Sequence, residues 1–147
     1  MKKQISRALL GLAAALTLVV AAHAQVLRTV TIRVPFDFVA GEKRMPAGRY
    51  TVQRINSASE TALLIRSEDG RASAVVLTNT GEPQPLTAAL VFRQHGDCYF
   101  LAEVSMPGTA SVRKLHRAGA ERRLERELAE QHKSDESKTV TVVGEVQ

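Results

Sequence analysis

Hydrophobic and polar residues alternate strictly over residues 29–38. A period of two residues is typical of a β-strand with one buried face and one solvated face. Pro35 interrupts the segment, and because proline has no N–H to donate to a neighbouring strand, the regular strand should end there or lie at a sheet edge. We therefore expect Phe36 and Phe38 to enter the core from an irregular segment. The hydrophobic face of the pattern consists of Val30, Ile32, Val34, Phe36 and Phe38.

Turn signals divide the residues that follow into further strands. Gly41, Pro46 and Gly48 indicate a turn, after which residues 49–55 have the composition of a strand. Residues 61–67 and 72–78 are short apolar runs on either side of Asp69-Gly70, a dipeptide that favours tight hairpin turns. Residues 79–85 contain two prolines, which predicts an exposed loop.

A second predicted hairpin consists of residues 86–95 and 98–105, which are apolar at consecutive positions. This pattern is typical of strands that are buried on both faces, so we place the hairpin at the centre of the fold. Together with residues 27–34 these segments make about six strands, and residues 111–115 offer a seventh. Many short strands with short connections favour a mainly β protein, with one antiparallel β-sandwich or small β-barrel over residues 25–110.

Residues 111–133 are expected to form a linker and a charged C-terminal α-helix. The helix would span residues 118–133, which are strong helix formers, with Ala120, Leu124 and Leu128 on one narrow apolar stripe. Two interpretations remain open. The helix either lies solvated against the β-domain through three small contacts or provides a contact surface for a partner.

Residues 134–147 are predicted to be a flexible tail. A polar segment over residues 134–138 precedes residues 139–146, which have strong β-propensity. Such a tail can be disordered, pair with an open sheet edge of its own domain, or add to the edge of a neighbouring molecule. We favour disorder or weak pairing.

The N-terminus has the three regions of a secretory signal peptide. Lys2, Lys3 and Arg7 precede an apolar run over residues 8–22, and 22–24 is an A-x-A cleavage site. We expect cleavage after Ala24, no transmembrane segment afterwards, and a periplasmic or secreted protein. The signal peptide removes three of the 20 basic residues, so 17 basic residues face 15 acidic ones, a net charge of +2. Because this excess is small, we expect no nucleic-acid partner.

Few residues are available for catalysis or metal binding. Cys98 is the only cysteine, which excludes an intramolecular disulfide, a multi-cysteine zinc site and a Cys-x-x-Cys pair, and we expect it to be a small buried hydrophobe. Histidines have no metal-ligand spacing, so we expect solvated side chains and no catalytic, cofactor-binding or metal-binding residues. Carboxylate pairs could serve a glycosidase but are ordinary for a protein surface. The histidines outside the signal peptide are His95, His116 and His132, and the carboxylate pairs are Asp97 with Glu103 and Asp37 with Glu42.

Four short stretches carry a resemblance to known proteins. Residues 34–38 (VPFDF) with residues 45–52 (MPAGRYTV), followed by LVF at 90–92 and GDCYFL at 96–101, resemble a group of small, exported, uncharacterised bacterial β-proteins. The resemblance would cover about residues 30–130. It implies export and a β-fold, and it carries over no activity, cofactor or site residue.

These observations predict an exported, non-catalytic binding or envelope-structural module without a cofactor. Its partner would be an unidentified envelope protein or surface component, contacted through residues 41–48, residues 79–85 or the helix. An alternative is a carrier of a small apolar molecule inside a β-barrel, since some of the six aromatic side chains could line a cavity. A hydrolase is a weaker alternative, because no nucleophile, base and acid stand at a recognisable spacing.

Overall fold

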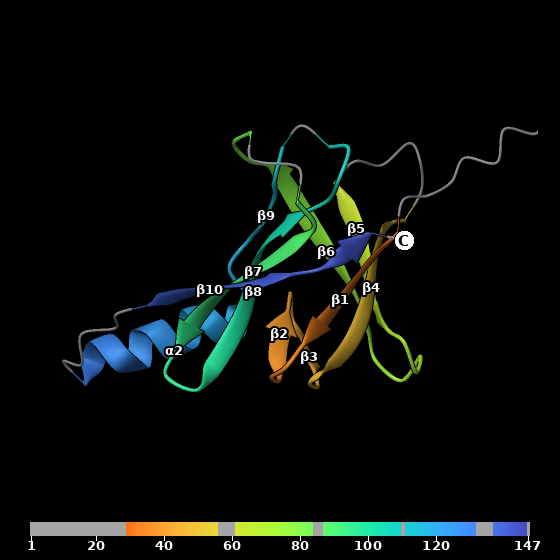
Figure 1. Ribbon diagram of the computed structural model, residues 1–147. Coiled ribbons are helices and arrows are strands. Elements are labelled where there is room, and N and C mark those ends of the chain that lie inside the picture. Colours follow the sequence, from red (N-terminus) through yellow and green to blue (C-terminus); the bar gives the residue numbers. More distant parts are fainter. Residues whose placement is uncertain (1–28, 56–60, 84–86, 110, 132–136, 147) are drawn as a thin grey trace, which may run out of the picture.

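The computed structural model describes residues 29–55, 61–83, 87–109, 111–131 and 137–146 (Figure 1). Eleven strands and one helix lie within these residues, so the protein is mainly β, as predicted. The expected signal peptide, residues 1–24, lies outside the described residues. The elements are β1 (Val30–Val34), β2 (Phe38–Ala40), β3 (Lys43–Met45), β4 (Gly48–Arg54), β5 (Ala62–Ser67), β6 (Ser73–Thr80), β7 (Ala89–His95), β8 (Cys98–Ser105), β9 (Arg113–Leu115), α2 (Gly119–Glu130), β10 (Lys138–Val143) and β11 (Glu145–Val146).

The strands follow one another across the sheet in the order β10-β7-β8-β9-β6-β5-β4-β1-β11. All neighbours on this path are antiparallel. The short hairpin of β2 and β3 lies off the path and joins β8 through one parallel pair, Val39 with Phe100. This attachment brings the segment after β1 next to the start of β8.

The break at Pro35 is confirmed. β1 ends at Val34 and β2 begins at Phe38, so the proline lies in the irregular segment between them. Phe38 is buried, and Phe36 packs against the core. The ring of Phe36 stacks on that of Tyr99 with centroids 3.9 Å apart and meets the ring of Phe92 edge to face.

Both predicted hairpins are present as β5–β6 and β7–β8. The first turn contains Gly70 with φ 72°, a left-handed conformation that favours glycine. The Asp69 carboxylate accepts hydrogen bonds from the Ser67 hydroxyl and the Arg71 N–H, which fixes the turn. The turn predicted at residues 41–48 is wrong in detail, because β3 lies within it and pairs with β2.

The sheet has more strands than the six or seven predicted, and the additional ones are mostly short. The expectation of a disordered or weakly paired tail is also wrong for residues 138–146. β10 pairs with β7 over six residues, and β11 pairs with β1 (Figure 1). Both edges offer unpaired N–H and C=O groups, and the Thr and Val residues of the tail suit a strand that satisfies them.

Gly144 joins these last two strands. Its N–H donates to the Ala88 carbonyl at 2.8 Å. A Cβ atom at this position would lie 2.9 Å from the Thr31 carbonyl oxygen and closer still to Ile32 Cγ1. Only glycine therefore allows the backbone to pass this close to β1 as it goes from one end of the sheet order to the other.

The core lies between the strands and is made of apolar side chains. Tyr50 is fully buried, and its hydroxyl donates to the Pro46 carbonyl, which satisfies the one polar group of the ring. The largest fully buried apolar side chains besides Tyr50 are Phe92, Ile32, Met45, Leu63, Ile65 and Leu90.

Candidate functional site

Helix α2 is attached to the β-domain at its first turn. Ala118 occupies the N-cap position and has no side-chain oxygen to accept from the free N–H groups of the helix. Glu42, in the turn between β2 and β3, supplies that oxygen, because its Oε1 accepts from the Gly119 N–H at 2.7 Å. A carboxylate at a helix N-terminus also interacts favourably with the helix dipole.

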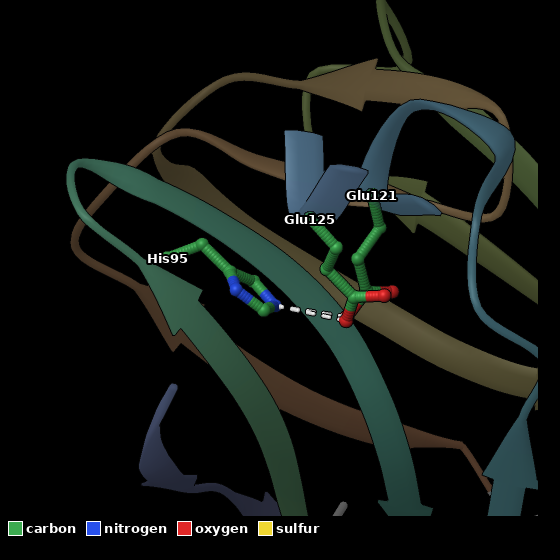
Figure 2. Close-up of side chains that lie close together, drawn as sticks. All are labelled: His95, Glu121 and Glu125. Carbon is green, nitrogen blue, oxygen red and sulfur yellow. Dashed lines mark hydrogen bonds and ion pairs between the residues drawn. The ribbon is translucent and has the colours of Figure 1, made fainter. Parts of the chain in front are cut away.

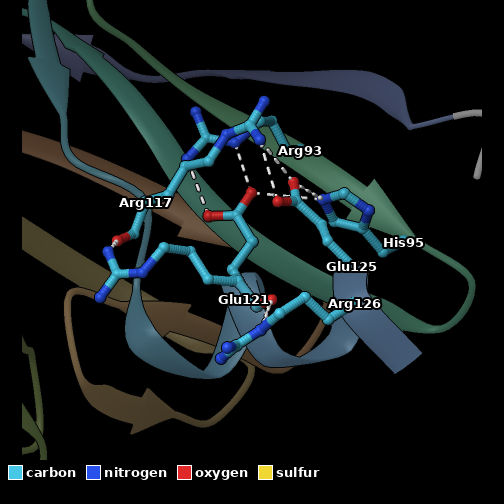
Figure 3. Close-up of polar contacts among 7 residues, drawn as sticks. Arg93, His95, Arg117, Glu121, Glu125 and Arg126 are labelled. Carbon is cyan, nitrogen blue, oxygen red and sulfur yellow. Dashed lines mark hydrogen bonds and ion pairs between the residues drawn. The ribbon is translucent and has the colours of Figure 1, made fainter. Parts of the chain in front are cut away.

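A second attachment is the ion pair between Glu121 and Arg93 of β7. Glu121 has 0% of its surface exposed. Arg93 Nε donates to Glu121 Oε1 at 2.5 Å and Arg93 Nη2 to Oε2 at 2.9 Å, a two-pronged contact that uses both carboxylate oxygens (Figure 3). The carboxylate is therefore buried with a full positive charge beside it.

His95 and Glu125 extend the network. His95 Nε2 lies 3.2 Å from Glu121 Oε1 and 3.8 Å from Glu125 Oε1 (Figure 2). Arg117 Nη1 in turn lies 2.9 Å from Glu125. The expectation that His95 is solvated is wrong, because it is buried against Glu121 and its ring meets that of Phe100 edge to face.

The protonation state of Glu121 follows from these contacts. Burial by itself would raise the pKa of Glu121, but the hydrogen bonds and the charge of Arg93, together with His95, lower the pKa below its ordinary value of 4.5. The same hydrogen bonds raise the pKa of Arg93. Both groups are charged at neutral pH, so the contact is an ion pair.

His95, Glu121 and Glu125 have the donor atoms of a metal site, with one ligand atom from each residue within 4.8 Å of the others. The separations of 3.2 and 3.8 Å bracket the edge of about 3.3 Å that a tetrahedral zinc site requires. Each carboxylate, however, already faces a guanidinium group, so a divalent cation would add charge to a balanced cluster. The arrangement suits a structural attachment of α2 better than a metal centre.

This cluster was not predicted from the sequence. The apolar stripe of α2 predicted contacts through Ala120, Leu124 and Leu128, but Glu121 is the buried residue of the helix and Ala120 is exposed. The physical reason is Arg93, which compensates a carboxylate that would otherwise stay in water. The signal available in the sequence is the pair Glu121 and Glu125, which lie four residues apart on one helix face.

A cleft of about 690 Å³ lies where α2, the β2–β3 hairpin and the start of β8 meet. Its charged residues are Asp37, Glu42, Asp97 and Arg44. Glu42 is thus shared between the cleft and the N-terminus of α2. The other lining residues are mostly apolar or aromatic: Phe38, Val39, Met45, Pro46, Cys98, Tyr99, Phe100, Ala120 and Leu124.

Several residues that the sequence analysis considered as candidates line this cleft. Cys98 is exposed at the cleft, so the expectation that it is buried is wrong; it begins β8 directly after the turn that contains Gly96. Asp97 lines the cleft, whereas Glu103 forms an ion pair with Lys114 at 3.8 Å. Asp37 and Glu42 both line the cleft.

Of the two other histidines, only His116 lies within the described residues, and it is not part of the cleft or the cluster. His116 is exposed, as predicted, and contacts the side-chain amide of Asn79. His132 lies outside the described residues.

Comparison with known proteins gives no further assignment. A scan against protein-family models and searches of curated proteins and of solved structures found no match. Among the described residues, no helix combines the length and the apolar character needed to cross a membrane. The cleft and the charged cluster are therefore the features on which a function can be argued.

Proposed function

We propose that the protein is an exported, non-catalytic binding module of the cell envelope, and that its ligand occupies the cleft beside α2. The cleft is the observation that carries this proposal. Its volume of about 690 Å³ lies within the range of about 300–1,000 Å³ typical of small-molecule sites. Its largely apolar lining with a few charged groups at the same place also matches such sites.

The charged cluster favours binding over catalysis, because its residues are engaged in holding α2 to β7. Arg93 and His95 both contact Glu121, and none of the three lines the cleft. Their contacts hold α2 to β7, and α2 contributes Ala120 and Leu124 to the wall of the cleft. The cluster thus serves as a support for a binding wall.

The topology supports a β-barrel for the β-domain. β10 and β11 are separated by one residue, yet they pair with opposite ends of the sheet order, β7 and β1. A strand that bends at Gly144 in this way covers the outer edges of both β7 and β1. The interior is packed with large side chains such as Tyr50, Phe92 and Leu90, which favours a ligand in the surface cleft over one carried inside the barrel.

Native mass spectrometry of the chain expressed with residues 1–24 and purified from the periplasm tests this proposal. We expect a chain that starts at Gln25 and carries a non-covalent adduct. Leu124→Arg, which places a long cation in the cleft, should remove the adduct. Val75→Arg is the matched control, because Val75 is 60% exposed on β6 and does not line this cleft. A bare wild-type protein, or an adduct that Leu124→Arg retains, would overturn the proposal.

A further inference from the structure

We propose that the ligand is a cationic amphiphile, a small molecule with an apolar chain and a positively charged nitrogen head. This inference rests on the proposed function of the cleft as a binding site. It is carried by the juxtaposition of apolar walls on α2, β3 and β8 with three carboxylates and one cation among the described residues that line the cleft.

The apolar part of the cleft comes from three separate elements. Leu124 of α2 is half-buried, Met45 of β3 is buried, and Phe100 of β8 is buried against the ring of His95. Because the ion pair of Arg93 with Glu121 fixes α2, Leu124 is held in place as one wall. An alkyl chain laid against these side chains would leave water, which is favourable in proportion to the apolar area covered.

The charged part has an excess of two negative charges, from Asp37, Glu42 and Asp97 against Arg44. Two of the carboxylates are held by the backbone. Asp37 Oδ1 accepts from the Ala47 N–H at 2.7 Å, and Glu42 Oε1 accepts from the Gly119 N–H at 2.7 Å. Each carboxylate has a second oxygen, and a fixed carboxylate attracts a cation without the loss of side-chain freedom that a mobile one has.

Tyr99 adds an aromatic ring to the same place. The ring lines the cleft and is fixed by stacking on Phe36, with 18° between the ring planes. Aromatic rings attract ammonium groups through their electron-rich faces, and carboxylates near such a ring reinforce the preference. Apolar walls, carboxylates and an aromatic ring together select a positively charged head over a neutral or negative one.

Three probes with the same alkyl chain test the inference: octyltrimethylammonium, octyl sulfate and octyl glucoside. Binding to the mature protein is measured by isothermal titration calorimetry below the micelle concentration of each probe. We expect octyltrimethylammonium to bind at least about ten-fold more tightly than octyl sulfate, and the preference to shrink as salt is added. Asp97→Asn should weaken octyltrimethylammonium binding about two- to five-fold, as expected for one exposed charge. Glu68→Gln, at the β5–β6 turn, is the matched control, because Glu68 does not line the cleft, and it should change nothing.

The outcomes separate this inference from the proposed function. If octyl sulfate or octyl glucoside binds as tightly and Leu124→Arg abolishes that binding, the cleft binds ligands but the cationic preference is wrong. If Asp97→Asn and Glu68→Gln have equal effects, the preference does not come from the cleft, and the inference is likewise overturned. If none of the probes binds, the inference is overturned, and the adduct experiment alone then decides the proposed function.

Discussion

Replacing Glu121 by glutamine should destabilise the protein more than any exposed charge change of the same kind. The substitution keeps the shape of the side chain but leaves the Arg93 guanidinium without its counter-charge. Removing one partner of a buried ion pair costs about 3–5 kcal/mol. The Arg93 side chain is 21% exposed and can recover some hydration, so we expect a loss of about 2–3 kcal/mol.

Urea unfolding followed by circular dichroism would measure this loss in the free energy of unfolding. Glu68→Gln provides the matched control, because Glu68 pairs with Arg49 at 3.5 Å on the surface, where the side chains are 62% and 53% exposed. Such exposed pairs contribute about 0–1 kcal/mol. A loss for Glu121→Gln that is no larger than the loss for Glu68→Gln would refute the view that this ion pair holds α2 to the sheet.

Hydrogen exchange distinguishes local destabilisation of α2 from destabilisation of the whole protein. If the ion pair acts mainly on α2, amide exchange in residues 119–130 should accelerate by about 30-fold or more in Glu121→Gln, whereas exchange in β4 and β5 should follow global stability only. The double variant Arg93→Met with Glu121→Leu should lose less stability than the sum of its single variants, because it removes both charges together.

Three further predictions concern other parts of the molecule. Gly144→Ala should lower the free energy of unfolding, measured with urea, by about 1–3 kcal/mol or more, because its Cβ would collide with Ile32. Gly48→Ala is the control and should cost less, since its Cβ would lie 3.7 Å from Tyr50. Equal losses would argue against the close approach of Gly144 to β1. Because the pKa of Glu121 is lower in the folded than in the unfolded chain, its contribution to stability is full above its ordinary pKa of 4.5 and is lost as the pH falls through the folded value. Unfolding at a series of acidic pH values should therefore show a smaller loss on acidification for Glu121→Gln than for the wild type, and parallel curves would contradict this. Cys98 should react with a thiol reagent in the folded protein at a rate near that of the unfolded chain, and protection until urea is added would show that it is not exposed.

The sequence predicted the parts of the fold that depend on neighbouring residues. Alternation located β1, Pro35 located its end, and Asp69-Gly70 located the β5–β6 turn, because each signal acts over a few residues. The pairing of β10 with β7 and of β11 with β1 could not be predicted in the same way. It depends on two sheet edges that are far from residues 138–146 in the chain, and a segment rich in Thr and Val is compatible with pairing and with disorder alike.

The candidate site was harder to predict because its residues come from distant segments. Asp37, Asp97 and Leu124 are separated along the chain by several strands, and no spacing rule connects them. Cys98 and His95 lie at the two ends of one hairpin turn, yet Cys98 is exposed and His95 is buried. The difference arises from α2, which brings Glu121 to His95, and nothing in the hairpin sequence indicates where that helix lies.

Helix α2 explains why a strongly charged segment belongs to the folded domain. Its residues 120 and 124 line the cleft, and its residues 121 and 125 contact Arg93 and His95 of β7. The two pairs, each spaced by four residues, therefore point to adjacent helix faces. The apolar pair alone is too small to hold a helix of twelve residues against the sheet. Polar contacts provide the additional attachment of α2 to the sheet. They are the ion pair of Glu121 with Arg93, the contacts of Glu125, and the hydrogen bond of Glu42 with the first turn. A change that neutralises Glu121 should therefore weaken ligand binding in the cleft although Glu121 does not line it, because Leu124 would lose its fixed position.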